Sequence, residues 1–172
     1  IVKPSSVAGS IAVPGSKSHT IRAVTAALLA DGESTVHAPL ISADTLSARN
    51  AAAGLGATFT TLPDGSWHFR GTAGRPHPQA ATLDLGNSGT GLRLLTAAAA
   101  LCDCKVEFDG DASLRTRTMA PLLAALEQLG ARTAAAPGGK CPLQVTGRLH
   151  GGKVAIDAQC SQFLTALLLA AR

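Results

Sequence analysis

The sequence predicts an α/β fold made of repeated units in which the elements follow the order βαβαββ. Stretches with strand composition alternate with helical stretches rich in alanine and leucine along the 172 residues. Three loops of small polar residues each join a strand to a helix, at a spacing of roughly 70 residues that is typical of repeated units. Aromatic residues make up only 3% of the chain, so Ala, Leu and Val are expected to fill the core. The three loops are Pro14–Ser18, Gly86–Thr90 and Gln159–Gln162.

The first unit is expected at about residues 9–72. Its first helix repeats apolar side chains at helical spacing and ends before Gly32, a residue suited to a helix C-cap. Ser42 is the expected N-cap of the second helix, and Pro63-Asp64-Gly65 is typical of a hairpin turn. The expected elements are the strand Ser10–Val13, the helix Lys17–Ala30, the strand Ser34–His37, the helix Ala43–Leu55 and the hairpin strands Ala57–Thr61 and Trp67–Arg70.

The second unit, at about residues 80–149, follows a linker rich in Gly, Pro and His and repeats the same order. Even the helix ends correspond, because Leu129-Gly130-Ala131 repeats Leu55-Gly56-Ala57. The expected elements are the strand Ala81–Asp84, the helix Ser88–Leu101, the strand Lys105–Phe108, the helix Thr118–Leu129 and the hairpin strands Arg132–Ala135 and Leu143–Thr146. A third unit, at about 151–172, consists of a strand Lys153–Asp157 and a helix Ser161–Ala171. The sequence therefore predicts two whole units and the start of a third.

Composition argues against several classes of partner. The formal net charge is +4, but the 15 Lys and Arg residues are scattered and no aromatic residues are interleaved with them, so a nucleic-acid module is not favoured. The charge fits small phosphorylated or carboxylated ligands and also fits ordinary surface charge. The longest apolar runs are about half the length needed to cross a bilayer, and no secretory signal is visible at the start.

The four cysteines show neither CxxC pairs nor zinc-finger spacing, so no metal site is expected. Free thiols in a reducing cytoplasm are favoured over disulfides. The cysteines are Cys102, Cys104, Cys141 and Cys160.

Cations stand where helices begin. Lys17 and Arg22 belong to the first turns of the first helix, Arg93 lies near the start of the third, and Arg117 precedes the fourth. A cation near a helix N-terminus is unfavourable by roughly 0.3–1 kcal/mol. A bound anion would offset this repulsion, and the unpaired N–H groups of three helix starts would help to bind it. The alternative is that these side chains bend away into solvent.

Four motifs occur in order: Pro14-Gly15-Ser16-Lys17-Ser18, Leu85–Thr90, Arg115–Met119 and Cys160–Leu168. They resemble the P-G-S-K-S, L-G-N-x-G-T, R-x-R-P-M and S-S-Q-F-L-T-A-L-L patterns of the 5-enolpyruvylshikimate-3-phosphate synthase (3-phosphoshikimate 1-carboxyvinyltransferase) family. The resemblance runs from Ser10 to Arg172. It implies an enolpyruvyl transferase lobe, in which three βαβαββ units surround a pseudo-threefold axis as an inside-out α/β barrel. The chain resembles an incomplete N-terminal lobe without the second, C-terminal lobe.

The resemblance also implies an activity in aromatic amino acid biosynthesis. Members of the family transfer the enolpyruvyl group of phosphoenolpyruvate to the 5-hydroxyl of shikimate 3-phosphate and release phosphate, through a tetrahedral intermediate and without metal or organic cofactor. A cytoplasmic enzyme that is a monomer at full length is implied. Carboxylates that transfer protons belong to the second lobe, so this chain alone is expected to be inactive while retaining weak binding of shikimate 3-phosphate.

Nine residues are assigned to the substrates by the resemblance. Lys17 is the expected catalytic residue and contacts both substrates, and Gln162 reaches between them. Thr90 either caps its helix or donates to the ligand. The residues expected at shikimate 3-phosphate are Lys17, Ser18, Arg22, Cys160, Ser161 and Gln162. The residues expected at phosphoenolpyruvate are Lys17, Asn87, Gly89, Arg117 and Gln162.

Two residues depart from the family patterns. Cys160 replaces a serine and is a weak donor, so a phosphate contact there would depend on its backbone N–H. Thr118 replaces a proline, which should loosen the start of its helix. Substrate affinity and inhibitor sensitivity are expected to change.

Two other functions compete with this hypothesis. Pro137-Gly138-Gly139-Lys140-Cys141 resembles the Pro-Gly-Gly-Cys loop of the related transferase acting on UDP-N-acetylglucosamine, although a lysine intervenes. The first loop also reads Lys-Ser where that relative has Lys-Asn. The other alternative is a noncatalytic lobe that only binds shikimate 3-phosphate.

Overall fold

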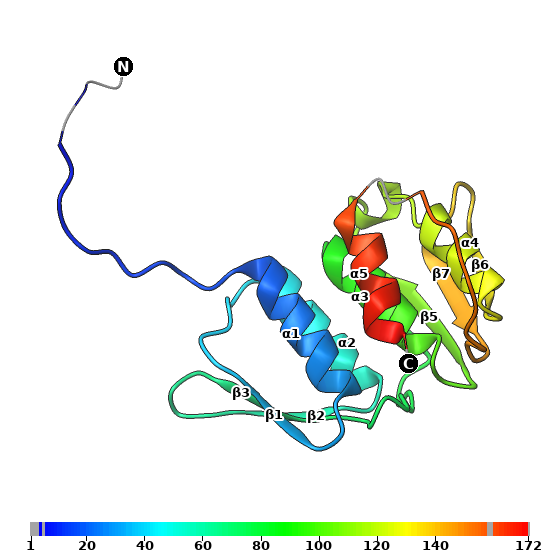
Figure 1. Cartoon of the computed structure of the whole chain (residues 1–172), viewed down its shortest axis with the longest axis horizontal. Helices are drawn as coiled ribbons and strands as arrows, with labels where there is room; N and C mark the ends of the chain where they lie inside the picture. Colours follow the sequence, from blue (N-terminus) through cyan, green and yellow to red (C-terminus); the bar gives the residue numbers. More distant parts are fainter. Residues whose placement is uncertain (1–3, 5, 158–159, 172) are drawn as a thin grey trace.

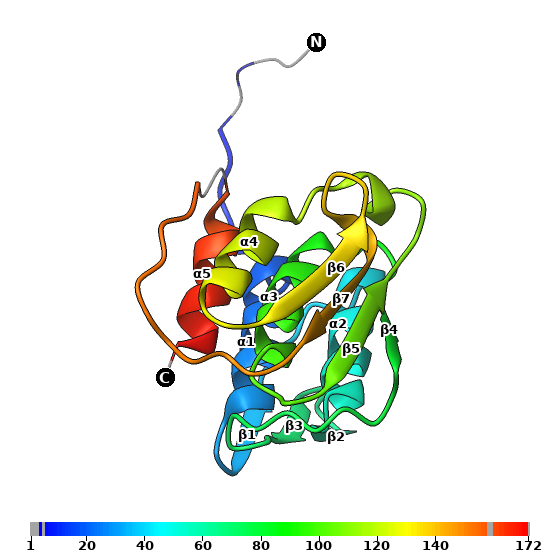
Figure 2. The ribbon, with the colours of Figure 1, turned by 90° about the vertical axis from the view of Figure 1, so that its right-hand side faces the viewer.

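The computed structural model describes residue 4, residues 6–157 and residues 160–171. Helices α1, α2, α3 and α5 pack side by side, and two β-sheets lie on different sides of this helix cluster (Figures 1 and 2). The helices are α1 (Lys17–Leu29), α2 (Ala43–Gly54), α3 (Gly89–Ala99), α4 (Ala120–Gln128) and α5 (Ser161–Ala170), with a short 3-10 helix η1 (Leu114–Thr116). The strands are β1 (Glu33–Val36), β2 (Thr58–Thr61), β3 (Trp67–Arg70), β4 (Thr82–Asp84), β5 (Lys105–Asp109), β6 (Arg132–Ala136) and β7 (Lys140–Thr146).

The first sheet has the strand order β1-β3-β2 and is antiparallel throughout. The second sheet has the order β4-β5-β7-β6, in which β4 and β5 are parallel and the other pairs are antiparallel. Trp67 and Phe69 of β3 are buried beneath α1, because alternate side chains of a strand share one face. Phe108 of β5 and Leu143 of β7 are paired in register and buried in the same way.

Helix α3 is the central helix of the molecule. Nine of its eleven residues are buried, and it contacts α1, α2, α5 and β5. Its leucines are apolar and favour burial, and its alanines are small enough to let neighbouring helices approach closely. The core is built mainly from Ala and Leu, as composition predicted, but valine is no more frequent in it than phenylalanine and its largest side chains are Trp67, Phe69 and Phe108.

Serine side chains fix the starts of three helices. Ser16 accepts from the N–H of His19 in α1, and Ser42 forms a reciprocal capping box with Thr45 in α2. Ser88 caps α3 by accepting from the N–H of Gly91 at 3.3 Å. The capping role left open for Thr90 therefore belongs to Ser88.

The predicted correspondence of helix ends is confirmed. Gly56 and Gly130 follow α2 and α4 with φ angles of +106° and +105°, a conformation that glycine adopts without steric cost. A single residue separates each glycine from an antiparallel hairpin, β2–β3 or β6–β7.

The predicted strand Ser10–Val13 is wrong. No described strand pairs with it, and Ile11 and Val13 are 89% and 83% exposed. A strand needs hydrogen bonds to a neighbour, and the first sheet offers none to this segment, which stands clear of the body in Figure 1. The predicted strand Lys153–Asp157 is not a strand either. Within the described ranges, the order βαβαββ is therefore complete only between β4 and β7.

Two expectations about single residues also need correction. Cys102 and Cys104 are joined in a disulfide, whereas Cys141 and Cys160 are free, so the expectation of free thiols holds for only two of the four. Thr118 does not leave the start of α4 loose. Its hydroxyl donates to the Gly138 carbonyl at 2.8 Å and accepts from the N–H of Ala120 at 3.2 Å, contacts that proline lacks.

None of the helices in the described ranges reaches the length and apolar character of a membrane span. Gln159 of the third predicted loop and Arg172 lie outside the described residues.

Candidate functional site

Side-chain contacts bring the starts of α1, α2, α3 and α5 to one end of the helix cluster. Lys17, the first residue of α1, donates from Nζ to Oδ2 of Asp44 in the first turn of α2, at 2.7 Å. Arg93 of α3 donates from Nη1 to Oε1 of Gln162, the second residue of α5, at 2.6 Å. The positive ends of these helix dipoles therefore point to a shared region, which suits anions.

Arg22 links α1 to α5 one turn further in. Its guanidinium donates to the hydroxyl and carbonyl of Ser18, and its Nη2 lies 3.5 Å from Oγ1 of Thr165. Thr165 in turn donates to the carbonyl of Ser161 at 2.8 Å. Arg22, Ser18 and Ser161, three of the residues assigned to shikimate 3-phosphate, thus belong to one hydrogen-bonded group.

The charge of Lys17 at the start of its helix is neutralised by an ion pair. The first turn of α1 contains no acidic residue, but Asp44 of α2 supplies the negative charge. The repulsion that suggested a bound anion at Lys17 is therefore offset within the chain. Sequence reasoning did not identify Asp44 or Thr165, although an aspartate just after the N-cap Ser42 marks a helix start.

Arg117 and Arg93 both lie against Gly89 at the start of α3. A Cβ atom at Gly89 would lie 2.5 Å from Nη1 of Arg117 and 3.2 Å from Nη1 of Arg93. Arg117 also donates from Nη2 to Oδ1 of Asn87 at 2.6 Å. Glycine is needed at position 89 because two guanidinium groups approach the backbone there. Its expected contact with phosphoenolpyruvate stays a prediction.

Arg93 is held between α3 and α5 and does not bend into solvent. Its guanidinium lies 5.1 Å from the ring centroid of Phe163, and Nη1 also donates to the Gly89 carbonyl at 3.2 Å. Burial lowers the pKa of Arg93; nearby Arg117 lowers it further, while Cys160 opposes the shift. Arginine stays charged under such conditions, so two positive groups share this end of the helix cluster.

Cys160 is the N-cap of α5, with extended backbone at φ −141° and no side-chain capping bond. The thiol therefore leaves the first N–H groups of α5 uncapped by a described side chain, in contrast to the serine caps of α1, α2 and α3. Ser161 next to it is exposed and Gln162 is half-buried. The start of α5 has backbone N–H donors available to an anion.

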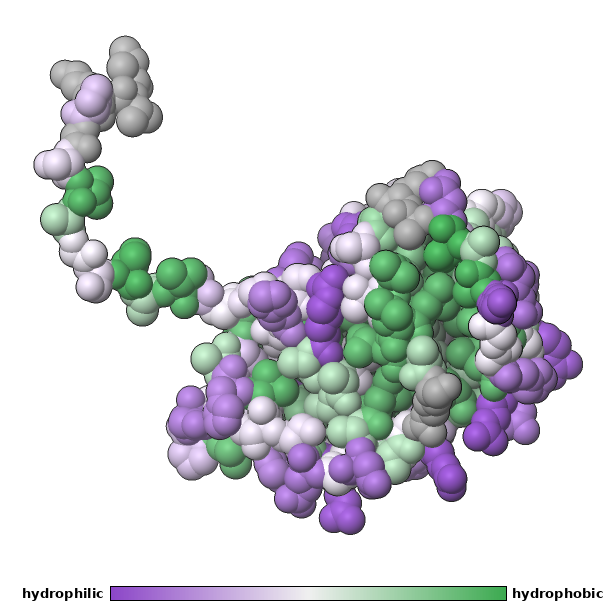
Figure 3. All heavy atoms as spheres, in the orientation of Figure 1, coloured by the Kyte–Doolittle hydropathy of each residue, from purple (hydrophilic) through white to green (hydrophobic). Residues whose placement is uncertain are grey.

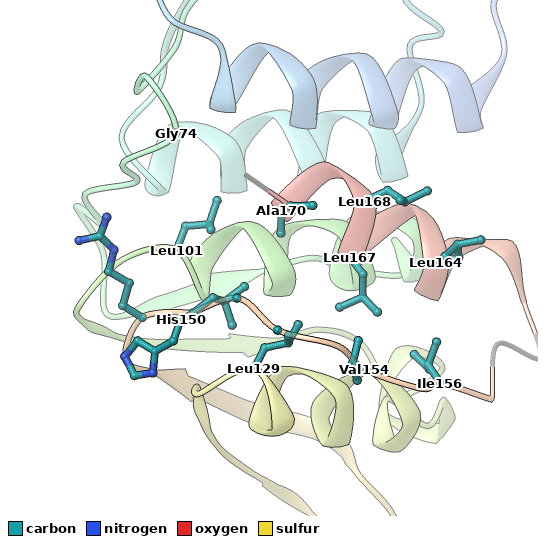
Figure 4. A pocket seen from close by; sticks show the side chains of 15 residues that line it. Gly74, Leu101, Leu129, His150, Val154, Ile156, Leu164, Leu167, Leu168 and Ala170 are labelled. Carbon is teal, nitrogen blue, oxygen red and sulfur yellow. The ribbon is translucent and has the colours of Figure 1, made fainter.

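A pocket of about 490 Å³ lies elsewhere, between α5 and the segment of residues 148–156. Figure 3 shows apolar side chains gathered on the face that includes α5, and Figure 4 shows Leu167 pointing toward Val154 across the pocket. Its lining is mostly leucine, valine, isoleucine and glycine, and also includes Arg148 and His150. Such a surface does not suit a small multiply charged ligand.

The sequence-predicted residues therefore fall into two hydrogen-bonded groups. Ser18, Arg22 and Ser161 form one through Thr165, whereas the described contact of Lys17 is with Asp44. Asn87, Gly89, Arg117 and Gln162 form the other, in which Arg93, a residue that the family motifs did not assign to the substrates, joins Gln162 to Gly89.

The model of the EPSP synthase (3-phosphoshikimate 1-carboxyvinyltransferase) family matches residues 1–172. A relative named 3-phosphoshikimate 1-carboxyvinyltransferase from Halobacterium salinarum is 46% identical over 98% of this chain and 40% of its own length. One of the same name from Acetivibrio thermocellus is 41% identical over the same shares. The chain thus spans about two fifths of the length of these curated relatives.

Solved structures agree with this assignment. EPSP synthase from Acinetobacter baumannii superimposes with a TM-score of 0.84 at 29% identity, over 94% of this chain and 37% of that one. The enolpyruvyl transferase NikO from Streptomyces tendae reaches a TM-score of 0.58 at 16% identity, over 94% and 37%, which supports the fold alone.

Proposed function

Since the chain belongs to the EPSP synthase family, we propose that it forms most of the substrate-holding N-terminal lobe of a 3-phosphoshikimate 1-carboxyvinyltransferase. The reaction transfers the enolpyruvyl group of phosphoenolpyruvate to the 5-hydroxyl of shikimate 3-phosphate and releases phosphate. Within the lobe we assign repeat units to about residues 9–72, 80–149 and 151–172.

The observation that carries the proposal is the meeting of four helix starts with Lys17, Arg22, Arg93 and Arg117. Both substrates bear a phosphate and a carboxylate. Guanidinium groups bind such oxygens in a planar fork, and helix N-terminal N–H groups add further donors. A site with this many donors and few acceptors suits two anions bound side by side.

In this proposal Arg22, Ser18 and Ser161 bind shikimate 3-phosphate through the hydrogen-bonded group that joins α1 to α5. The backbone N–H of Cys160 supports the same phosphate. Lys17 lies at the edge of this group. When substrate binds, its ammonium group either leaves Asp44 for substrate oxygens or contacts both Asp44 and the substrate. An ammonium group held there stabilises charge as the 5-hydroxyl reacts.

Phosphoenolpyruvate binds at the start of α3, next to Asn87, Gly89 and Arg117. Gln162 lies between the two positions, because it is attached to α5 and contacts Arg93 of α3. The proton-transferring carboxylates come from the second lobe, so the present chain alone binds but does not turn over. We propose a cytoplasmic enzyme that is a monomer at full length and uses no metal or organic cofactor.

Calorimetry on the 172-residue chain tests this proposal. Shikimate 3-phosphate should bind, and shikimate without the phosphate and UDP-N-acetylglucosamine should not. Arg22→Gln should weaken binding at least about tenfold, since a charge-assisted contact is lost. Arg70→Gln, which removes the same charge from an exposed position on β3, should leave affinity unchanged.

A phosphate-release assay with both substrates separates binding from catalysis. No release above background is expected from the isolated chain. Preferential binding of the UDP-sugar would indicate the function of the related transferase acting on UDP-N-acetylglucosamine. If neither ligand binds, the proposed site is contradicted.

A further inference from the structure

Two side-chain amides in the candidate site each face an arginine. Oε1 of Gln162 accepts from Nη1 of Arg93, and Oδ1 of Asn87 accepts from Nη2 of Arg117, both at 2.6 Å. The two pairs come from different elements: α3 with α5, and the loop before α3 with the segment after η1. The same arrangement therefore occurs twice in one site.

An arginine can only donate, so each contact fixes the direction of the amide. The carbonyl oxygen must face the guanidinium, and the NH2 group must face away from it. Neither Nε2 of Gln162 nor Nδ2 of Asn87 donates to another residue in the described part of the chain. Each amide therefore presents two unused N–H donors on the side opposite its arginine.

Arg93 is well placed to hold an amide still. It projects from the most buried helix, contacts the ring of Phe163, and donates to the Gly89 carbonyl as well as to Gln162. Its Nε is buried and has no partner among the described residues. The guanidinium is therefore positioned by packing from both helices, whereas Gln162 is a long side chain on the first turn of α5 with several free torsions.

We propose that Arg93 is a positioning residue that orients the Gln162 amide so that its NH2 group donates to a phosphate or carboxylate oxygen of the bound substrate. Arg93 acts through Gln162 and does not contact the ligand. The identity of the ligand rests on the proposed function, whereas the orientation of the amide can be tested without any ligand.

The first experiment measures nitrogen-15 relaxation of the Gln162 NH2 group in the 172-residue chain, assigned by the loss of its signal in Gln162→Glu. In the unsubstituted chain the order parameter should be close to that of rigid backbone, and Arg93→Lys should lower it below about 0.6. Lysine keeps the charge but has no planar fork to hold both acceptors. The order parameter of the Asn87 NH2 group should be unchanged in Arg93→Lys. The matched control Arg70→Lys should leave the Gln162 order parameter unchanged. An unchanged Gln162 order parameter in Arg93→Lys overturns the proposal.

The second experiment measures phosphoenolpyruvate affinity with shikimate 3-phosphate present. Arg93→Lys should weaken binding about tenfold when Gln162 is present and should have no further effect in a Gln162→Leu background. Equal losses in both backgrounds would mean that Arg93 contacts the ligand itself, which also overturns the proposal. Gln162→Glu keeps acceptors for Arg93 but removes the donors, so it should lose binding while the fold is retained.

The two experiments distinguish the inference from the function on which it rests. If the unsubstituted chain binds neither substrate, the proposed function fails. The relaxation measurement still decides whether Arg93 orients Gln162.

Discussion

Gly89→Ala should separate ligand binding from stability. The added methyl carbon would lie 2.5 Å from Nη1 of Arg117, so this guanidinium must move by about 0.9 Å to reach ordinary contact distance. A displacement of that size stretches the bond of 2.6 Å between Arg117 and Asn87 to about 3.5 Å, the limit of a hydrogen bond. Arg93 needs a shift of only about 0.2 Å.

The effect on stability should be small because two contributions oppose each other. The contact between Arg117 and the exposed Asn87 contributes about 0.5–1 kcal/mol after solvent screening. Replacing a helical glycine with alanine stabilises by about 0.5–1 kcal/mol. The free energy of unfolding should therefore change by less than about 0.5 kcal/mol. Binding should suffer more, because a misplaced charge-assisted contact to a phosphate costs about 1.5–3 kcal/mol, or at least about tenfold in affinity.

Urea denaturation and calorimetry with each substrate check these values. Phosphoenolpyruvate affinity should fall in Gly89→Ala, while shikimate 3-phosphate affinity stays unchanged. Gly91→Ala provides the contrast within the same helix: its Cβ would lie 2.7 Å from the capping Oγ of Ser88 and 3.2 Å from Cβ of Ala48, so the Tm should fall. Undiminished phosphoenolpyruvate affinity in Gly89→Ala would refute the placement of Arg117 at this ligand.

Three further outcomes are expected. Asp44→Asn removes the charged partner of Lys17. Calorimetry at low salt should therefore show tighter binding of shikimate 3-phosphate, by up to about fivefold. Weaker binding would mean that Asp44 is needed to position the lysine. Ser42→Ala removes the capping box of α2 and should lower the free energy of unfolding by about 1 kcal/mol in urea, and an unchanged midpoint would contradict the cap. Burial raises the pKa of the Cys141 thiol from 9.0 to about 11, so the folded state holds this proton more tightly than the unfolded state. Stability should therefore be lost as pH rises from 9 to 11, and Cys141→Ala should remove this part of the pH dependence in denaturation curves.

The helices and hairpins could be predicted because their signals are local. Apolar periodicity, with the N-cap Ser42 at the start of α2, places α1, α2 and α3 within one or two residues of their observed ends. The repeated Leu-Gly-Ala sequence placed the helix C-termini for the same reason, because a glycine that follows a helical stretch favours the C-cap conformation with positive φ that Gly56 and Gly130 adopt.

The strand predicted at Ser10–Val13 shows where local signals fail. Alternation of apolar residues is compatible with a strand but says nothing about whether a neighbouring strand is present. Ile11 and Val13 have the right pattern and yet remain exposed, because neither sheet extends to them.

The sequence motifs named candidate residues for the site but not the side-chain contacts between them. Motifs identify Lys17, Arg117 and Gln162, whereas the partners that neutralise or orient them depend on helix packing. Asp44 comes from a second helix, and Arg93 reaches Gln162 across 69 positions of sequence. Contacts of this kind need the three-dimensional structure.

The proposed substrate site can be located by nuclear magnetic resonance mapping of shikimate 3-phosphate on the nitrogen-15-labelled chain. Backbone amide shifts should concentrate at the starts of α1 and α5, around Ser18, Arg22, Ser161 and Gln162, and should be lost in Arg22→Gln. Shifts confined to the apolar pocket beside Val154, or no shifts at saturating ligand, would contradict the claim that the helix starts form the substrate site.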